Sequence, residues 1–401
     1  MGAATGVDGL LSQRGHNVGE SRGLPGAREG VISFSGGFPD PARFPYTEIA
    51  EATARTMQTH GQWPLQYGPS MGYEGMLDFL VEKLGKHQGI QCSRENLLLT
   101  AGGSQALALL CDLFVDQGDT VLSEAPTWMG AGRIFRNVGA EVESVPLDGE
   151  GTRVDALEER LRDLKARGVT PKFFYIIPNF QNPSGVTTTL ARRQRIVELA
   201  AEYNFAILED DAYFDLRFAG EKLPTLYTLD GGRRVFYFGT FSKILAAGMR
   251  LGWIVGDPAM IGRMGGLKAE GSTNPFAAHV AFEYCKDGRL DARITDLIET
   301  YRRRRDLTLG ELDERMPEDV TWTVPDGGFF VWVTLPESVD VQRLLPKARE
   351  AGLEFSPGPI FYFDGSGRHR LRLSYSYVEE DQLARGVQLL ADLIREVSSE
   401  Q

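Results

Sequence analysis

Short buried strands alternate with helices between residues 94 and 214, and this alternation constrains the fold more than any other feature of the chain. The apolar runs NLLLT (96–100) and FAILEDDAYF (205–214) are typical of buried strands, whereas SQALALLCDLFV (104–115) and LARRQRIVELAAEYN (190–204) repeat their apolar residues at helical spacing. Strands joined by helices form parallel sheets that helices cover on both faces. We therefore predict an α/β fold built on a mainly parallel sheet of the seven-stranded type.

Polar residues follow several of the predicted strands at their carboxyl ends. They are Asn182, Asp210, Lys243 and the turn Gly102-Gly103-Ser104. In open α/β sheets the ligand lies outside the carboxyl ends of the strands. We therefore expect these residues to gather around one ligand at one edge of the sheet.

The character of the chain changes after about residue 291. A long charged helix is predicted over 292–315, and VTWTVPDGGFFVWVTL (320–335) reads as two strands around an Asp-Gly-Gly turn. A further strand is expected over 370–376. The predicted domains are a flexible N-terminal arm (1–30), a large ligand-binding domain (61–290) and a small α+β domain (31–60 with 291–401).

The composition argues against several classes of function. The net charge of −12 disfavours nucleic acid and anionic membranes as main partners. Three cysteines without a CxxC pair, Cys92, Cys111 and Cys285, favour a reducing compartment, the cytoplasm, over a disulfide-bonded fold. The five histidines form no HxH or HxxxH pair, so no metal site is predicted, and no apolar run has the length of a membrane span.

One small molecule, pyridoxal 5′-phosphate, would use all of the polar groups expected at this edge. Its phosphate suits the N–H groups of Gly103, Ser104 and Gln105, which open the helix 104–115. A hydroxyl from Thr240 and the guanidinium of Arg250 would add to that site. The other common phosphate motifs, GxxxxGK[ST] and GxGxxG, do not occur.

The ring and aldehyde of the same molecule match the remaining residues. The aldehyde reacts with a lysine amine, for which Lys243 is the candidate. The ring nitrogen requires a carboxylate, which Asp210 supplies at the end of its strand. Asn182 and Tyr213 are candidates for the ring oxygen, and Trp128 for stacking on the ring face.

Each of these residues also has an ordinary structural reading. A lysine on a loop is usually a surface residue. Asp210, between two other acids, reads equally well as a helix cap or an ion-paired strand end. Asn182-Pro183 alone is most often a turn, and Trp128 alone is more often a core residue.

The order and spacing of the motifs resemble the class I and II aminotransferases, which are fold type I pyridoxal-phosphate enzymes of the aspartate aminotransferase type. The resemblance covers about residues 31–395, and SGGFPD (35–40) with EDDAY (209–213) makes the 2-aminoadipate, aromatic and kynurenine aminotransferases the most similar subgroup. The same module forms the C-terminal part of MocR-type regulators. The matching segments are LQYGPSMGYEGMLDFL (65–80), LLLTAGGSQALAL (97–109), QNPSG (181–185), LEDDAY (208–213), GTFSKILAAGMRLGW (239–253) and RLRLSYS (370–376).

This resemblance implies a role for each candidate in cofactor binding. Lys243 would form the Schiff base and shuttle the proton, and Asp210, three residues before Tyr213 as in the family, would pair with the ring nitrogen ahead of Asp211. Trp128 would stack on the ring, where the family usually has a smaller aromatic residue. The phosphate would be surrounded by Ser104, Gln105, Thr240, Ser242 and Arg250, and the ring oxygen held by Asn182 and Tyr213.

The resemblance also implies a substrate site and a partner. Arg372 would bind the α-carboxylate of the substrate, with Gly37 and Asn182 lining the pocket. Tyr67 would reach the phosphate of a partner subunit, so the active unit is expected to be a homodimer.

The predicted activity is transfer of the amino group of an α-amino acid to a 2-oxo acid, without a metal. Other pyridoxal-phosphate reactions, namely decarboxylation, β-elimination or oxidation, stay open because they begin in the same way. A cofactor-sensing regulator is disfavoured, since only about 30 residues precede VISFSGG (31–37).

The identity of the substrate side chain also stays open. Phe38, Arg43, Phe276 and Phe361 are pocket candidates. The aromatic ones would accept an aryl or long aliphatic chain, whereas Arg14, Arg22 and Arg28 would suit an acidic one.

Overall fold

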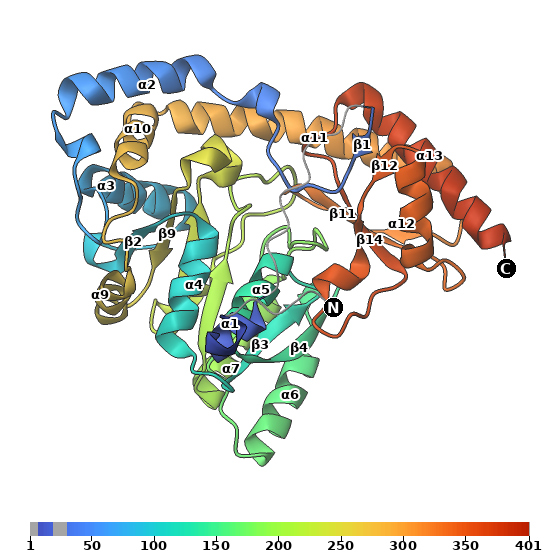
Figure 1. Cartoon of the computed structure of the whole chain (residues 1–401), viewed down its shortest axis with the longest axis horizontal. Coiled ribbons are helices and arrows are strands. Elements are labelled where there is room, and N and C mark those ends of the chain that lie inside the picture. Colours follow the sequence, from blue (N-terminus) through green and yellow to red (C-terminus); the bar gives the residue numbers. More distant parts are fainter. Residues whose placement is uncertain (1–6, 19–29, 401) are drawn as a thin grey trace.

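The centre of the protein is an eight-stranded sheet between two layers of helices (Figure 1). The computed structural model describes residues 7–18 and 30–400. The strand order is β2-β9-β8-β7-β6-β3-β4-β5. The strands are β2 (Leu97–Thr100), β3 (Thr120–Ala125), β4 (Glu141–Asp148), β5 (Gly151–Thr152), β6 (Phe173–Ile176), β7 (Ala206–Asp210), β8 (Val235–Thr240) and β9 (Gly252–Val255).

The predicted mainly parallel sheet is confirmed. β4, β3, β6, β7 and β8 pair in parallel, whereas β9 runs antiparallel to both β2 and β8. The two-residue β5 pairs antiparallel with β4 at one edge and brings the seven expected strands to eight. Residues of β2, β3, β6, β8 and β9 are buried along their whole length, because helices cover both faces.

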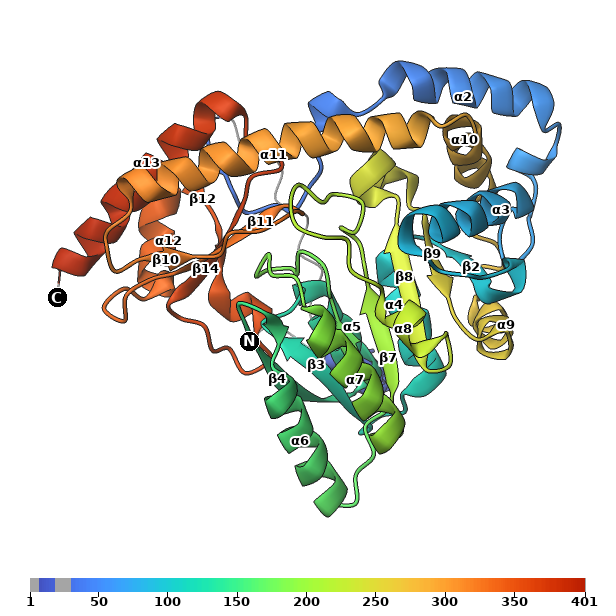
Figure 2. The same cartoon turned by 180° about the vertical axis from the view of Figure 1, so that it is seen from behind.

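Helices on the two faces come from the segments between the strands. α4 and α5 lie in front of the sheet in Figure 1, and α7 and α8 lie on the opposite face, as Figure 2 shows. α4 turns Ala106, Leu107 and Leu110 inward, at the helical spacing expected from the sequence. The helices around this sheet are α3 (Glu74–Lys83), α4 (Gly103–Phe114), α5 (Met129–Val138), α6 (Val154–Ala166), α7 (Leu190–Tyr203), α8 (Leu226–Asp230), α9 (Pro258–Leu267) and α10 (Pro275–Cys285).

A second, four-stranded antiparallel sheet has the order β10-β11-β14-β13. The predicted pair of strands around the Asp-Gly-Gly turn is confirmed, because β10 pairs antiparallel with β11. Figure 2 shows α11 running past both sheets. The elements here are β10 (Thr321–Trp322), β11 (Phe330–Thr334), β12 (Leu353–Glu354), β13 (Ser356–Pro357), β14 (Arg370–Ser374), α11 (Arg289–Arg315), α12 (Val341–Glu350) and α13 (Glu380–Ser399).

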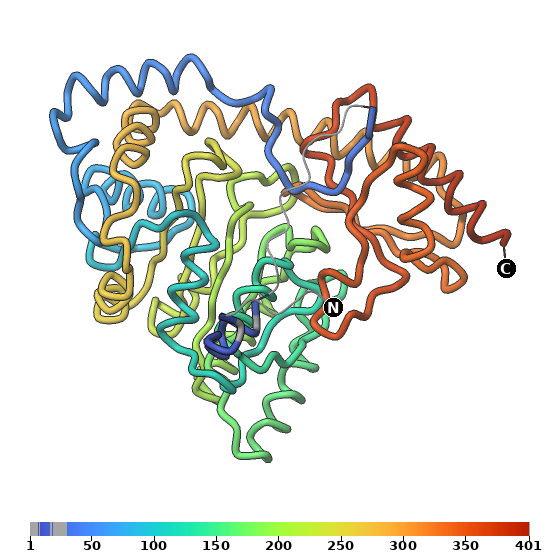
Figure 3. Tube along the Cα trace, viewed as in Figure 1, coloured from blue at the N-terminus to red at the C-terminus, as the bar shows by residue number. Residues whose placement is uncertain are grey.

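The N-terminal part of the chain joins the C-terminal sheet. β1 (Ile32–Ser33) pairs in parallel with β12, and the tube in Figure 3 shows this segment among the C-terminal elements before α2 (Tyr46–Thr59) leads away. This pairing is compatible with the small domain predicted from 31–60 and 291–401, and the domain boundaries themselves stay a prediction.

Part of the arm predicted to be flexible is helical. α1 (Gln13–Asn17) contacts α5, and Arg14 forms an ion pair with Asp112 at 2.8 Å and donates to the carbonyl of Asn137 at 3.1 Å. An exposed ion pair of this kind contributes less than about 1 kcal/mol, so it holds the helix only weakly. Arg22 and Arg28 lie outside the described residues.

Candidate functional site

The parallel pairing brings the predicted residues to one edge of the large sheet. Asp210 is the last residue of β7, and Thr240 is the last residue of the neighbouring β8. Lys243 follows β8 in a π-helical turn, η6 (Ser242–Ala246), and Asn182 follows β6. Arg372 belongs to β14 of the small sheet and donates to Asn182, so the site lies between the two sheets.

Lys243 is held between a loop carbonyl and two aromatic rings. Its Nζ donates to the carbonyl of Gly37 at 2.8 Å and lies 5.8 Å from the ring centre of Tyr213 and 5.7 Å from that of Phe329. Burial, together with the positive charge of Arg372, lowers the pKa of this amine to about 8. Near neutral pH a useful fraction of Lys243 is therefore the free amine, which is the form that acts as nucleophile and base.

Asp210 is a buried carboxylate with one tyrosine partner. It is 7% exposed, and the hydroxyl of Tyr175 donates to its Oδ2 at 2.8 Å. Burial raises the pKa of Asp210 to about 7, and the hydrogen bond from Tyr175 opposes this shift. A cation beside Asp210 would favour its ionised form, so the environment suits a protonated ring nitrogen.

Tyr175 was missed in the sequence-based set. A signal was present, because it is the one residue with a polar tip in the buried strand FFYI (173–176), and a buried tyrosine hydroxyl usually has a hydrogen-bonding partner.

The acids on either side of Asp210 have other partners. Glu209 accepts from the N–H groups of Leu226 and Tyr227, at 2.8 and 2.9 Å, at the start of α8. Asp211 accepts from the side-chain amide of Asn179 at 2.8 Å. Successive side chains of a strand point to opposite faces, so these contacts agree with the ranking of Asp210 over Asp211, which stays a prediction.

The raised pKa of Asp210 couples its protonation to folding. The folded protein holds this proton more tightly than the unfolded chain, so the stabilisation is fully present below about pH 4 and is lost as the pH rises through about 7. We expect the thermal midpoint of the cofactor-free protein to fall between pH 5 and 8, and that of Asp210→Asn to fall by about 2–4 °C less. Calorimetry at several pH values checks this, with Asp319→Asn on the surface as control. A wild-type slope in Asp210→Asn would contradict it.

Arg372 is a buried guanidinium held by neutral groups. It donates to Asn182 Oδ1 at 2.8 Å, to the carbonyl of Ser35 at 2.5 Å and to Ser356 Oγ at 3.3 Å. Its side chain also lies against the ring of Phe330, whose centre is 4.2 Å from the guanidinium carbon. Sequence reasoning missed Ser35, Ser356 and Phe330, since they meet Arg372 only through tertiary contacts.

No carboxylate of the described residues pairs with Arg372, and its Nε has no hydrogen-bond partner there. Arg372 is 3% exposed, and burial lowers its pKa to about 10. A buried cation without an acid is unfavourable unless a ligand supplies the anion. The site is therefore suited to a carboxylate.

One loop contacts both cations of the site. Its Ser35 carbonyl accepts from Arg372 and its Gly37 carbonyl accepts from Lys243. Gly37 is required for this approach, because a Cβ there would lie 2.7 Å from the ring of Phe330. The loop is fixed further by Ser376, whose hydroxyl donates to the carbonyl of Phe38 at 2.7 Å.

A second group of predicted residues lies around the start of α4. Gly102 has a φ of 86° and is followed by Gly103 and Ser104, the first two residues of the helix, which has no side-chain N-cap. A Cβ at Gly102 would lie 2.8 Å from Nη2 of Arg250, so only glycine lets this guanidinium lie so close to the helix start. Arg250 also donates to the carbonyl of Ala101 at 2.8 Å.

Two hydroxyl groups complete this cluster. The oxygens of Thr240 and Ser242 lie 2.8 Å apart, and the Ser242 N–H donates to Thr240 at 3.0 Å. A helix N-terminus with a guanidinium and hydroxyls has the chemistry of a phosphate site.

Three predicted residues are not tied to these clusters by their side-chain contacts. Gln105 turns back to accept from the N–H of Ala101 at 2.6 Å and donates to Glu270. The ring of Trp128 lies against Gly130, at the start of α5, and Tyr67 is 87% exposed. Their roles stay predictions.

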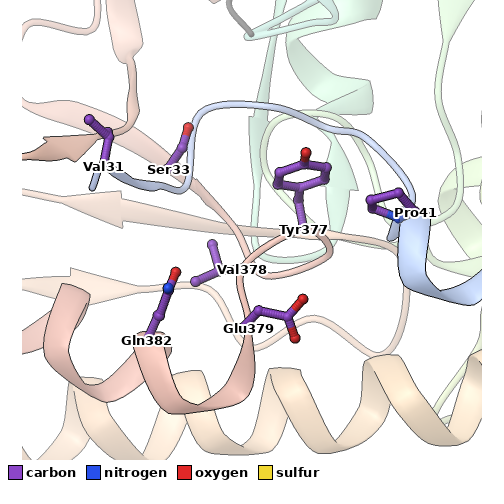
Figure 4. A pocket seen from close by; sticks show the side chains of 7 residues that line it. All are labelled: Val31, Ser33, Pro41, Tyr377, Val378, Glu379 and Gln382. Carbon is purple, nitrogen blue, oxygen red and sulfur yellow. The ribbon is translucent and has the colours of Figure 1, made fainter. Parts of the chain in front are cut away.

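A separate hollow of about 180 Å³ lies beside the first turn of α13 (Figure 4). None of the predicted site residues lines it; the lining residues are Val31, Ser33, Pro41, Tyr377, Val378, Glu379 and Gln382. In the described parts of the chain, no three His, Cys, Asp or Glu side chains gather as a metal site. Within those same parts, none of the helices has the length and apolar character needed to cross a membrane.

Comparison with known families and sequences gives a consistent result. The family model of "Aminotransferase class I and II" matches residues 29–390. The aromatic-amino-acid aminotransferase 1 of Thermococcus litoralis is 40% identical over 91% of this chain and 88% of its own length. The 2-aminoadipate transaminase of Thermus thermophilus is 37% identical over 92% of this chain and 91% of its own.

Solved structures agree with these sequence relatives. The kynurenine aminotransferase of Pyrococcus horikoshii, in complex with PMP, superposes with a TM-score of 0.91 at 39% identity, covering 98% of each chain. The alpha-aminoadipate aminotransferase of Thermus thermophilus, complexed with N-(5'-phosphopyridoxyl)-L-leucine, gives a TM-score of 0.85 at 35% identity, covering 93% of this chain and 94% of the other.

Proposed function

Since the chain belongs to the class I and II aminotransferases, and is a pyridoxal-phosphate-dependent enzyme that transfers amino groups between amino acids and 2-oxo acids, we propose which residues act and which donors it takes. Lys243 is the covalent and proton-transfer residue, and Arg372 binds the α-carboxylate of the donor. The observation that carries this proposal is the buried Arg372, which lacks an acid partner in the described residues and is close enough to Lys243 to lower the pKa of its amine.

The residues of the site fit the cofactor. Asp210 offers a buried carboxylate with a raised pKa, and a neighbouring cation would lower that pKa. Gly102 leaves the space through which Arg250 approaches the start of α4. We propose that the phosphate is held by the N–H groups of Gly103, Ser104 and Gln105, with the side chains of Thr240, Ser242 and Arg250, and that the ring is held by Asp210, Asn182, Tyr213 and Trp128.

The chemistry that pyridoxal phosphate supplies when bound is an aldehyde that takes up amino groups and a cationic ring that withdraws electrons from Cα of the donor. Asp210 keeps the proton on the ring nitrogen. Arg372 orients the donor by its carboxylate, so that the Cα–H bond faces the amine of Lys243. Lys243, with a pKa of about 8, would take this proton and deliver it to the former aldehyde carbon of the cofactor within the same half of the transfer.

We propose donors with an aromatic or long apolar side chain. Relatives are named for aromatic amino acids, kynurenine and 2-aminoadipate. Around Arg372, the rings of Phe330 and Phe361 support the aromatic choice, and Trp332 lies edge-on to Phe361 at 5.5 Å.

Single amino acids added to the holoprotein without an oxo acid test the proposed function. A donor is expected to release one equivalent of its 2-oxo acid per site and then stop until a second oxo acid is added. Phenylalanine, tyrosine, kynurenine, 2-aminoadipate and aspartate are compared. Release of ammonia, carbon dioxide or peroxide instead would overturn amino transfer as the main reaction. Aspartate or 2-aminoadipate as the fastest donor would overturn the aromatic preference, because both have an acidic side chain.

We also propose a homodimer in which Tyr67 reaches the phosphate of the partner subunit. Trp63 and Leu65, in the short helix η3 (Trp63–Leu65), and Tyr67 just after it are all largely exposed. Contiguous exposed apolar side chains of this size usually mark an interface.

The free cysteines, Cys92, Cys111 and Cys285, favour the cytoplasm as the compartment.

Mixing two inactive variants tests this arrangement. Lys243→Ala and Tyr67→Ala are denatured together, refolded and loaded with cofactor. If Tyr67 acts across the interface, each mixed dimer has one site with both residues, and about a quarter of the wild-type sites become active. Activity and cofactor affinity are measured, with the separately refolded variants as controls. If mixing produces no gain over those controls, Tyr67 does not act across an interface.

A further inference from the structure

The turn that carries Lys243 contains buried carbonyl groups that its own helix leaves unpaired. Ile244 and Leu245 of η6 are each 1% exposed. Carbonyl groups in the last turn of a helix have no N–H partner within it, and burying them unpaired is unfavourable. The turn therefore needs donors from another element.

Arg293, near the start of α11, supplies those donors. Its Nε donates to the carbonyl of Ile244 at 2.8 Å and its Nη2 to that of Leu245 at 3.2 Å. Its Nη1 donates to the carbonyl of Arg43 at 2.6 Å. All three bonds go to main-chain oxygens, and none goes to a carboxylate. The yellow turn of η6 lies directly under α11 in Figure 1.

This arrangement fixes two segments relative to each other. A guanidinium is a rigid planar fork, so three bonds from it set the mutual positions of three carbonyls. Two of them belong to the turn of Lys243. The third, at Arg43, belongs to the segment that follows Gly37, whose own carbonyl accepts from Lys243.

We propose that Arg293 is a positioning residue for Lys243. π-helical turns are rare and occur mostly as single turns, whereas the α-helical register is the common one. A change of register by one residue would rotate the Lys243 side chain by roughly 100° about the helix axis, away from the donor. Arg293 prevents this by holding the carbonyls in place. The inference rests on the role of Lys243 in the proposed function.

The test compares Arg293→Gln with Arg289→Gln, a matched loss of one arginine from the same helix. In the described part of the chain, Arg289 forms one ion pair, with the exposed Glu51 at 3.4 Å, and has no hydrogen bond to η6. In Arg293→Gln holoprotein we expect kcat to fall by about tenfold to a hundredfold. The KM of the donor should stay within about threefold, because Arg372 is untouched. Arg289→Gln should behave as wild type.

A second readout does not depend on turnover. Borohydride reduction fixes the cofactor on Lys243, and peptide mass spectrometry measures the fraction of folded sites that carry it. Arg293→Gln is expected to trap less than half of the wild-type fraction under brief reduction, whereas a residue that only stabilised the fold would leave this fraction per folded site unchanged.

Arg293→Lys keeps the charge without the fork, and it carries the test if the glutamine variant does not fold. It is expected to lie between wild type and Arg293→Gln in kcat and in trapping. If the folded variants keep wild-type kcat and wild-type trapping, the role of Arg293 is overturned and the proposed function is not. A wild-type holoprotein that traps no cofactor on Lys243 overturns both this inference and the proposed function.

Discussion

Replacing Lys243 with alanine is expected to lower kcat by about 10⁴-fold or more, because the change removes the group that both binds the cofactor covalently and moves the proton. The nearby groups cannot take over. The ring of Tyr213 lies beside Lys243, but burial raises the pKa of its hydroxyl well above the ordinary value, so it stays protonated and cannot accept the proton. Steady-state rates with the best donor, measured at saturating cofactor, give the size of the loss.

The control for this prediction is Lys172→Ala. Lys172 is a lysine of the same protein that forms a surface ion pair with Asp119 at 3.2 Å, and it should keep wild-type kcat. A small primary amine added to Lys243→Ala should restore part of the rate, because it can take the proton in place of the missing side chain. Retention of more than about a tenth of wild-type kcat by Lys243→Ala would show that another residue is the base.

Replacing Arg372 with methionine is expected to lower kcat/KM for amino acid donors by about 10³-fold. The methionine fills part of the space but leaves the carboxylate of the donor without a cation. Stability should change little or rise, since the change removes a buried cation that has no acid partner among residues 7–18 and 30–400. Arg372→Lys keeps the charge but not the planar fork, and we expect it to lose about 10²-fold.

Donors that lack the carboxylate make this prediction specific to Arg372. Wild-type enzyme should prefer phenylalanine to phenethylamine by a large factor, whereas Arg372→Met should show almost no preference. Equal losses for both donors in Arg372→Met would mean that Arg372 supports the fold of the site and does not bind the carboxylate.

Much of the large sheet could be predicted from the sequence, because its rules are local. Buried strands of four to six residues followed by amphipathic helices predict parallel pairing, and parallel strands bring their carboxyl ends to one edge. This is why Asp210, Thr240 and Lys243 could be grouped from the linear sequence. The antiparallel insertion of β9 between β2 and β8 was not predicted, because an antiparallel strand with both faces buried has the same apolar pattern as a parallel one.

Contacts of the site residues outside the large sheet could not be predicted in the same way. Ser356 meets Arg372 because β13 pairs with β14 in a register that places them opposite each other. Ser35 meets Arg372 through a main-chain carbonyl, for which the residue type carries no signal. The role of Arg293 could not be recognised from the sequence either, because it lies in a charged helix where arginines are usually solvated.

A donor amino acid competes with the loop at residues 35–37 for groups of the site. The carbonyl of Ser35 accepts from Arg372, which is proposed to bind the donor carboxylate, and the carbonyl of Gly37 accepts from Lys243, which is proposed to take the proton, so a donor arriving from solution competes with acceptors that are already tethered in the site. The measured affinity is then the intrinsic affinity multiplied by the fraction of molecules in which the loop has moved aside. Substitutions of Ser376, whose hydroxyl holds the carbonyl of Phe38, can therefore change KM while leaving the chemical groups, and kcat, as they are.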